Sequence, residues 1–295
     1  MRNYIDSFKL FLLEVKKASD NTIESYMRDI HQFSDYCTSV NLKDTAGVDT
    51  AFLEKYTEHL RKIGKSEATV SRIIASLRCY FRFLVSQKIA DINPADKLSI
   101  KKTEKKLPGI LTANEIMKLI SQTDGIDFKS IRDKAMLELL YATGIKVSEL
   151  IELKLSDINL QIGFLNLSND NKERIIPIYP NAVKSITNYV ENVRPAIVLE
   201  GETDRLFTNM TGSNLSRQGF WKIIKHYASL AGINKEITPH TLRHSFAAHL
   251  LENGAKLSDI KEMLGHSDIS STQIYAKLMK SKYTSAYAKF HPLAK

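Results

Sequence analysis

Four polar side chains near the C-terminal end of the sequence have types and spacing that suit chemistry on one group. His240 and Arg243 lie three residues apart in a stretch whose apolar residues recur at helical spacing, so we expect both to project from one helix face. His266 directly follows Gly265, a residue type that commonly ends helices. Tyr275 lies nine residues further on. This spacing predicts that the four side chains converge.

A phosphodiester under attack would account for this set of residue types. Negative charge develops on its non-bridging oxygens, and fixed cations and N–H donors stabilise that charge. The planar fork of Arg243 can grip two phosphate oxygens at once. The hydroxyl of Tyr275 is a covalent nucleophile once its proton is lost. We therefore interpret Tyr275 as the attacking group, with Arg243, His240 and His266 around the phosphate.

Structural roles and a metal site would also fit some of these residues. A single histidine or tyrosine on an apolar helix is often structural. His240 and His244 also have the i, i+4 spacing of a zinc-binding pair. However, the stretch reads HTLRH, which lacks the glutamate of H-E-x-x-H and places a cation between the two histidines. We therefore predict no metal site here.

The same stretch resembles the signature of the tyrosine recombinase (phage integrase) family. That signature has H-x-x-R, then L-G-H, then a tyrosine nine residues later. Here HTLR ends at Arg243, LGH ends at His266, and the run LGHSDISSTQIY, which ends at Tyr275, is similar to the Xer branch. The resemblance covers nearly the whole chain and implies a site-specific recombinase that cuts and rejoins DNA through a 3′-phosphotyrosyl intermediate. Because that intermediate keeps the bond energy, the resemblance implies no cofactor.

Two positions depart from the pattern of this family. Its phrase A-T-G-x-R-V-S-E-L carries the first catalytic arginine, and here that position is Lys146. Its catalytic lysine lies in a β-hairpin, where the matching position is Asn169, with Lys172 three residues away. Lysine keeps the charge but loses the fork, and asparagine cannot protonate a leaving group. Since one lost charge-stabilising donor costs about 10²–10³ in rate, we expect weakened, partner-dependent or substrate-restricted activity. We expect Glu149 to orient neighbouring donors and His244 to pack beside the site.

The Xer resemblance also implies partners. They are double-stranded DNA with a short, nearly palindromic site and a homo- or hetero-tetramer formed with a second Xer-type recombinase, with a DNA translocase as a further candidate. The implied role is chromosome dimer resolution. Three alternatives remain: a Xer-like DNA-binding partner that has lost catalysis, a mobile-element integrase, and a nicking enzyme that resembles a type IB topoisomerase.

Composition agrees with an anionic partner. The chain has 295 residues, with 42 lysines and arginines against 33 aspartates and glutamates, and its formal net charge is +9. The two cysteines indicate no disulfide framework, which is usual in a reducing cytosol. No apolar run reaches the length of a membrane span, and the N-terminal stretch is typical of an amphipathic helix rather than a signal peptide. We therefore predict a cytoplasmic protein that does not enter a membrane.

Helical periodicity and one linker divide the chain into two predicted domains, with a mainly α fold. Residues 1–90 contain four helical patterns and resemble the SAM-like core-binding domain of tyrosine recombinases. Residues 91–108 contain prolines and lysines without periodicity, which predicts an extended basic linker. Residues 109–295 combine helical patterns with a strand-patterned hairpin over 157–179. They predict a mostly helical catalytic domain with a small antiparallel sheet.

The stretch SEATVSRIIASLRCYFRFL resembles the DNA-contacting helix of the family's N-terminal domain. Its hydroxyls and guanidinium groups are of types that bind backbone phosphates, although a solvated helix face would have a similar composition. The candidate DNA-binding residues are Lys65, Ser71, Arg72 and Arg78.

Overall fold

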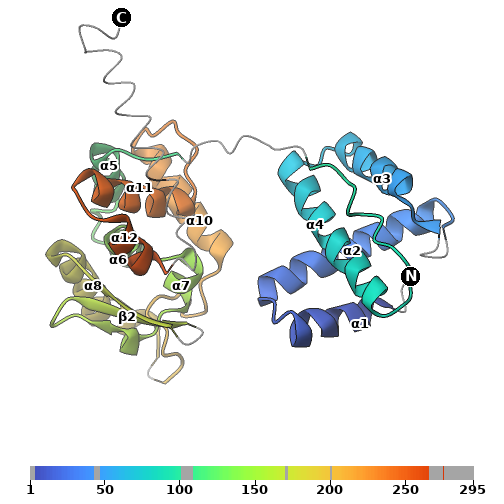
Figure 1. Ribbon diagram of the computed structural model, residues 1–295. Coiled ribbons are helices and arrows are strands. Elements are labelled where there is room, and N and C mark those ends of the chain that lie inside the picture. Colours follow the sequence, from blue (N-terminus) through green and yellow to red (C-terminus); the bar gives the residue numbers. More distant parts are fainter. Residues whose placement is uncertain are drawn as a thin grey trace, which may run out of the picture. The chain divides into compact units, whose positions relative to one another are not determined.

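The computed structural model divides the chain into two compact units, Met1–Lys105 and Lys106–Lys295 (Figure 1). Helices make up most of the described part of both units, and its one sheet has three antiparallel strands. The predicted fold class, mainly helical with a small antiparallel sheet, is therefore confirmed. None of the helices in the described ranges has the length and apolar character that a membrane crossing requires. The described residues are 4–42, 47–100, 109–169, 172–199, 201–265 and 275.

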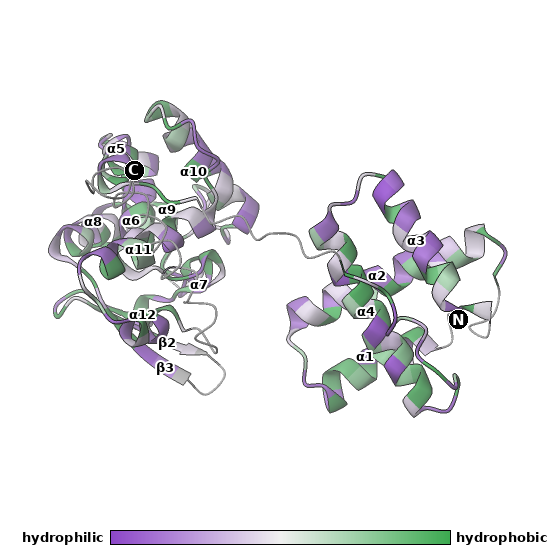
Figure 2. Cartoon of the chain, turned by 45° about the horizontal axis from the view of Figure 1, so that its top comes forward, coloured by the Kyte–Doolittle hydropathy of each residue, from purple (hydrophilic) through white to green (hydrophobic). Residues whose placement is uncertain are grey.

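Four α-helices enclose an aromatic core in the first unit. Phe33 packs edge-on against Tyr56, with ring centroids 5.1 Å apart, and Phe8 packs edge-on against Tyr80 at 5.2 Å. All four rings are buried, because each helix mixes hydrophobic and hydrophilic residues and turns its hydrophobic face inward (Figure 2). The helices are α1 (Ile5–Leu10), which continues into a π-helical turn (Phe11–Val15), α2 (Asp20–Ser39), α3 (Thr50–Lys62) and α4 (Glu67–Ser86).

Part of the predicted linker packs onto this first unit instead of extending away from it. Ala95 and Leu98 are buried in the core of the first unit. Arg78 donates from Nε to the carbonyl of Ala95 at 3.0 Å and from Nη2 to the carbonyl of Leu98 at 2.6 Å. The carbonyl of Ala95 also accepts a hydrogen bond from the backbone N–H of Leu98 at 3.2 Å, so Arg78 ties an irregular turn to α4. Residues 101–108 of the predicted linker lie outside the described residues.

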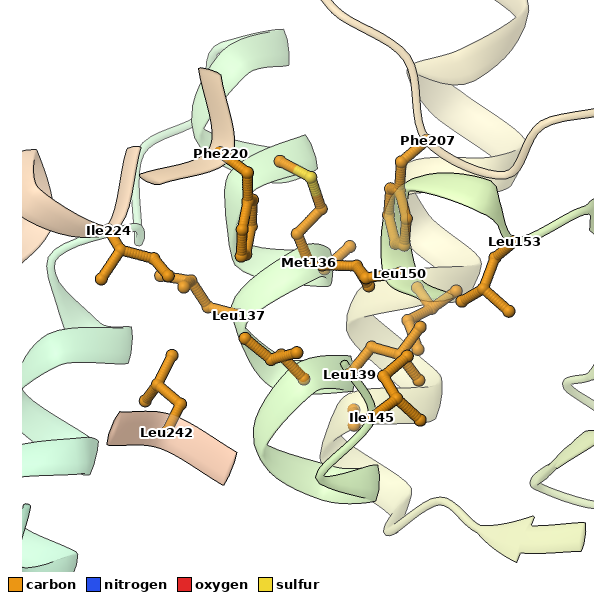
Figure 3. Close-up of a cluster of buried hydrophobic side chains, with 14 of the residues drawn as sticks. Met136, Leu137, Leu139, Ile145, Leu150, Leu153, Phe207, Phe220, Ile224 and Leu242 are labelled. Carbon is orange, nitrogen blue, oxygen red and sulfur yellow. The ribbon is translucent and has the colours of Figure 1, made fainter. Parts of the chain in front are cut away.

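Helix α6 is the central element of the second unit and is buried along most of its length. Met136 and Leu137 project from it into a core that also contains Phe207, Phe220 and Leu242 (Figure 3). This core fixes the helices that surround α6. The helices of the unit are α5 (Ala113–Ser121), α6 (Phe128–Thr143), α7 (Val147–Glu152), α8 (Pro180–Asn192), α9 (Arg194–Ile197), α10 (Arg217–Leu230), α11 (Pro239–Glu252) and α12 (Leu257–Leu264).

The sheet of the second unit is an antiparallel meander of order β1-β2-β3. In the β2–β3 ladder, Leu165 pairs with Ile176 and both are buried, whereas Phe164 and Ile175 on the opposite face are exposed. Alternate side chains of a strand point to opposite faces, so this pattern places one face of the sheet on the core. The strands are β1 (Ile158–Asn159), β2 (Phe164–Asn169) and β3 (Lys172–Pro177).

Candidate active site

Helix α11 carries the H-x-x-R stretch and begins with a regular cap. Thr238 precedes the helix, and its hydroxyl accepts a hydrogen bond from the backbone N–H of Thr241 at 3.3 Å, while Pro239 occupies the first helical position. This start presents His240 as an exposed side chain and sends Arg243 inward, where it is buried. The capped start of α11 therefore fixes the positions from which His240 and Arg243 project.

Two main-chain carbonyl groups hold the guanidinium group of Arg243. Nη1 donates to the carbonyl of Gly144 at 2.6 Å, and Nη2 donates to the carbonyl of Leu264 at 2.6 Å. Gly144 caps the C-terminal end of α6 and Leu264 is the last residue of α12, so both carbonyls belong to helix ends that carry partial negative charge. Burial lowers the pKa of Arg243, and the nearby charge of Glu149 opposes that decrease. Arg243 is thus a fixed, buried cation.

Arg243 lines a cavity of about 240 Å³ together with Lys146 and His240, two other residues that the sequence predicted for the site. Arg217, at the first position of α10, also lines this cavity, and the sequence motifs did not point to it. The remaining lining residues are Ile145, Val147, Ser148 and Pro239, so no carboxylate of the described residues faces the cavity. The cavity therefore favours an anion, because the charged groups that line it in the described part of the chain are all cationic.

Glu149 joins the start of α7 to strand β3. Its Oε2 accepts a hydrogen bond from the backbone N–H of Lys146 at 2.7 Å, and its Oε1 lies 2.5 Å from Nη2 of Arg174. Both side chains of this ion pair are only 9% exposed, and Nη1 of Arg174 also donates to the carbonyl of Met263 at 3.1 Å. Three segments that border the site are therefore linked through one carboxylate and one guanidinium group. This geometry agrees with the orienting role that we expect for Glu149.

Tyr275 lies against α11 but is not among the residues that line the cavity. Its side chain is 1% exposed, and its hydroxyl lies 2.9 Å from Nδ1 of His244. Burial raises the pKa of Tyr275, and the charge of Arg243 opposes the increase. Burial also lowers the pKa of His244 to about 4, with His240 and Arg243 adding to the decrease, so this imidazole is neutral at pH 7. The hydroxyl of the predicted nucleophile is thus buried beside the cavity and forms a hydrogen bond with a neutral histidine.

The structure does not bring all the predicted residues to the cavity. The Cα atoms of Asn169 and Lys172 face each other as the last pair of the β2–β3 ladder, and the side chains of both lie outside the described part of the chain. His266 also falls outside the described residues. The zinc alternative required a third ligand beside His240 and His244, and the described residues contain no group of three or more potential metal-binding side chains.

Two of the four DNA-binding candidates in the first unit make internal contacts. Nη1 of Arg72 lies 2.5 Å from Oδ2 of the buried Asp29, which also accepts from the hydroxyl of Ser76 at 2.6 Å. Arg78 binds the two carbonyls of the segment after α4, as described above. Lys65 is exposed. The fourth candidate, Ser71, is half-buried.

Comparisons with known proteins cover the same two units. The model of the Phage integrase family matches residues 110–282, and that of the Phage integrase N-terminal SAM-like domain matches residues 5–88. The tyrosine recombinase XerD of Staphylococcus epidermidis is 42% identical over 295 residues, which cover all of both chains. The XerD of Halalkalibacterium halodurans is 44% identical over 296 residues, which cover 100% of this chain and 99% of the relative.

Solved structures show the same fold. The crystal structure of XerA recombinase matches with a TM-score of 0.55 and 26% identity, over 98% of this chain and 99% of the other. The XerH site-specific recombinase, in a post-cleavage complex with palindromic difH substrate, matches with a TM-score of 0.76 and 20% identity, over 96% of this chain and 84% of the other.

Proposed function

This chain belongs to the phage integrase family and is a Xer-type tyrosine recombinase, and from that premise we propose that it cuts and rejoins DNA at the cavity lined by Lys146, His240 and Arg243. The observation that carries the proposal is the position of Tyr275. Its hydroxyl contacts His244, the residue that follows Arg243 on α11, and the guanidinium group of Arg243 lines a cavity whose described lining residues include no carboxylate. The proposed nucleophile and the anion site therefore contact adjacent residues of one helix.

In the proposed reaction, a backbone phosphate of the duplex occupies the cavity. Arg243, fixed by its two carbonyl contacts, stabilises the charge on the non-bridging oxygens as the pentavalent phosphate forms. The phenolic oxygen of Tyr275 forms a bond to phosphorus and gives up its proton. The bond from phosphorus to the 5′-oxygen breaks, and that oxygen leaves as a hydroxyl group after it takes a proton. A 5′-hydroxyl from a partner strand then reverses these steps and releases Tyr275.

Attack requires the hydroxyl of Tyr275 to leave its buried position, because it does not line the cavity in this structure. It also requires the hydroxyl to give up the hydrogen bond with His244. We infer that this structure represents a resting state and that DNA binding precedes the movement. The proposed roles of His240 and His266 are to stabilise the phosphate and to handle protons.

Lys146 and Asn169 make us expect slow chemistry. Lys146 supplies one ammonium charge where the family has an arginine fork, and Asn169 stands where the family has a lysine. The test is a nicked suicide duplex that carries the recombination site and traps the covalent adduct. We expect a slow adduct on Tyr275, its absence from Tyr275→Phe, and a faster reaction in the Lys146→Arg, Asn169→Lys double variant. If the double variant forms no adduct either, the enzyme proposal is wrong.

The proposed substrate is a short, nearly palindromic site in double-stranded DNA, with chromosome dimer resolution as the role. The relatives named XerD and the XerH complex with its palindromic substrate support this choice. We propose a tetramer formed with a second copy or with another Xer-type recombinase, with a DNA translocase as a candidate regulator. A chromosomal substrate would place the protein in the cytoplasm. Sequencing of DNA trapped on the protein in cells tests this, since a mobile-element integrase would return the ends of an element.

A DNA-binding partner without catalysis is the second candidate; the substitutions at Lys146 and Asn169 suggest it, whereas the match to relatives named as tyrosine recombinases does not favour it. In that case the chain would clamp a duplex while an active partner exchanges the strands. In this proposal residues 1–90 clamp one side of the duplex, residues 91–108 connect to the catalytic domain of residues 109–295, and Lys65 and Ser71 contact phosphates. Strand exchange measured with and without an active partner separates the two candidates, because only an enzyme forms its own Tyr275 adduct.

A further inference from the structure

The cavity beside Arg243 is lined by one more arginine than the sequence motifs account for. This arginine is Arg217, at the N-terminal end of α10, and none of the described residues that line the cavity carries a carboxylate. We propose that Arg217 contacts the same phosphate as Lys146 and supplies the guanidinium fork that a lysine cannot provide. This inference rests on the proposed function, and it identifies a further phosphate-contacting residue of that active site.

The backbone position of Arg217 is fixed while its side chain is free. Ser216 caps α10, and its hydroxyl accepts a hydrogen bond from the backbone N–H of Gly219 at 3.0 Å. Phe220, one turn further on, is fully buried in the core of the second unit. The guanidinium group of Arg217, however, makes no hydrogen bond or ion pair with another described residue, and the side chain is exposed. The backbone of Arg217 is therefore held in place, and its guanidinium group can bind a ligand.

The other arginines of the region are already engaged. Arg243 binds the carbonyls of Gly144 and Leu264, and Arg174 pairs with Glu149. These contacts hold each guanidinium group in one place but occupy part of its donors. Arg217 alone among the three has all five N–H groups unoccupied by described residues, which favours a bidentate grip on phosphate.

The electrostatics of the cavity favour an anion between Arg217 and Lys146. Lys146, Arg217 and Arg243 line it with positive charges that repel one another, and the nearby carboxylate of Glu149, which acts on Arg243, is not among the lining residues. The N-terminal ends of α10 and α11, at Arg217 and Pro239, add the positive ends of two helix dipoles of 14 residues each. A phosphate would relieve this repulsion and pair with donors from three different segments.

An arginine near DNA can also read guanine bases in the major groove, so the experiment must separate the two uses. The first arm uses the full-length protein and a nicked suicide duplex in which the scissile phosphate is either ordinary or a methylphosphonate. A methyl group in place of one non-bridging oxygen removes the negative charge that Arg217 would stabilise. Arg217→Ala should slow adduct formation about 10²-fold on the ordinary duplex. On the methylphosphonate duplex the difference from wild type should shrink to a few-fold.

Two variants control this arm. Arg217→Lys keeps the charge without the fork and should give an intermediate rate on the ordinary duplex. Lys222→Ala removes a positive charge from an exposed position of the same helix outside the cavity, and should match wild type on both duplexes. An equal deficit of Arg217→Ala on the two duplexes, or no deficit, overturns the inference.

The second arm tests compensation for Lys146. In a Lys146→Arg background, position 146 has its own fork, so Arg217→Ala should cost only a few-fold instead of about 10²-fold. If Arg217→Ala costs the same factor in both backgrounds, the two residues act independently and compensation is excluded.

The third arm does not depend on cleavage. Affinity for a duplex of random sequence and for the recombination-site duplex of the first arm is measured against salt concentration for wild type, Lys146→Ala, Arg217→Ala and the double variant. Two cations on one phosphate predict that the double variant changes the logarithmic salt slope by about 0.9, whereas two separate phosphates predict about 1.8. A loss confined to the cognate sequence would assign Arg217 to base reading and overturn the inference.

These arms keep the two failures apart. If wild type and the restored variant form no adduct but the salt slopes agree with one shared phosphate, the proposed enzyme function is wrong and the phosphate site stands. If wild type forms the adduct and Arg217→Ala reacts at the same rate, the inference about Arg217 is wrong and the proposed function stands.

Discussion

The hydroxyl of Tyr275 lies 2.9 Å from Nδ1 of His244, so a residue outside the predicted motif contacts the predicted nucleophile. His244 follows Arg243 directly, and the two side chains of α11 therefore serve different partners. Arg243 lines the anion cavity, and His244 contacts the buried Tyr275. With its pKa lowered to about 4, His244 is neutral at pH 7, and in the tautomer protonated at Nε2 its Nδ1 accepts a hydrogen bond from the tyrosine hydroxyl. This hydrogen bond fixes where Tyr275 rests.

Removal of the hydrogen-bond acceptor of His244 should expose Tyr275. His244→Phe leaves a buried hydroxyl without its partner, which costs about 1–3 kcal/mol and increases the population with Tyr275 undocked by about fivefold to 150-fold. We expect Tyr275 to react correspondingly faster with tetranitromethane, as measured by mass spectrometry of the tyrosine-containing peptides.

The chain provides a matched control for this experiment. The hydroxyl of Tyr141 lies 2.9 Å from Nδ1 of His249, which is also on α11. His249→Phe should accelerate nitration of Tyr141 and leave Tyr275 unchanged. Equal nitration of Tyr275 in His244→Phe and wild type would mean that packing, and not this hydrogen bond, holds the tyrosine.

The depressed pKa of His244 also predicts how stability depends on pH. The pKa of this imidazole is 6.5 in its ordinary state, which applies to the unfolded chain, and about 4 in the folded state. Between these values the unfolded state binds more protons, so the free energy of unfolding of the second unit is highest above pH 6.5 and decreases as the pH falls towards 4. His244→Gln removes the titrating group and should flatten this decrease. Urea unfolding from about pH 4 to 7 measures both curves, and parallel curves would contradict the prediction.

Arg72 is expected to stabilise the first unit more than it binds DNA. Its guanidinium group pairs with Asp29, whose side chain is only 1% exposed, so Arg72→Ala leaves the hydroxyl of Ser76 to support a buried carboxylate without its cation. We expect a loss of about 2–3 kcal/mol in urea unfolding of the first unit. Unchanged stability in Arg72→Ala would refute the structural role.

The exposed Lys65 is the control for Arg72. Lys65→Ala should leave the stability of the first unit unchanged, because an exposed lysine at the surface contributes little to folding. If this residue contacts a phosphate, the same variant should reduce the salt slope of DNA binding by about 0.9.

Local patterns were sufficient to predict much of this fold. Helical periodicity predicted the helices of both units, and alternation around Phe164 and Ile176 predicted the hairpin, because buried faces impose those periods on the sequence. Motif spacing also selected His240 and Arg243, and the family resemblance selected Lys146; all three line one cavity. These features depend on contacts that are close in sequence or on a pattern that spans the whole site.

Contacts between distant segments were not predictable in the same way. Asp29 lies 43 residues before Arg72, so nothing near Arg72 indicates that its charge is paired inside the unit. Arg217 follows the capping residue Ser216, and this position near a helix N-terminus was the one sequence signal for contact with an anion. Its place beside Lys146 depends on how α7, α10 and α11 pack, which no local pattern specifies.

Gly265 should be required for the geometry of the site. Its φ of +64° favours glycine, and a Cβ atom there would lie 2.5 Å from Nη1 of Arg174, the guanidinium group that pairs with Glu149. Gly265→Ala should therefore displace Arg174, destabilise the second unit by about 1–3 kcal/mol, and slow Tyr275 adduct formation. Gly254→Ala is the matched control, because its φ is also positive, at +92°, but its Cβ would meet nothing within 4 Å. We expect backbone strain in Gly254→Ala to lower the free energy of unfolding measured with urea. The rate of adduct formation should fall by no more than a few-fold. If the two variants lose adduct rate equally, the contact between Gly265 and Arg174 has no special role in the reaction.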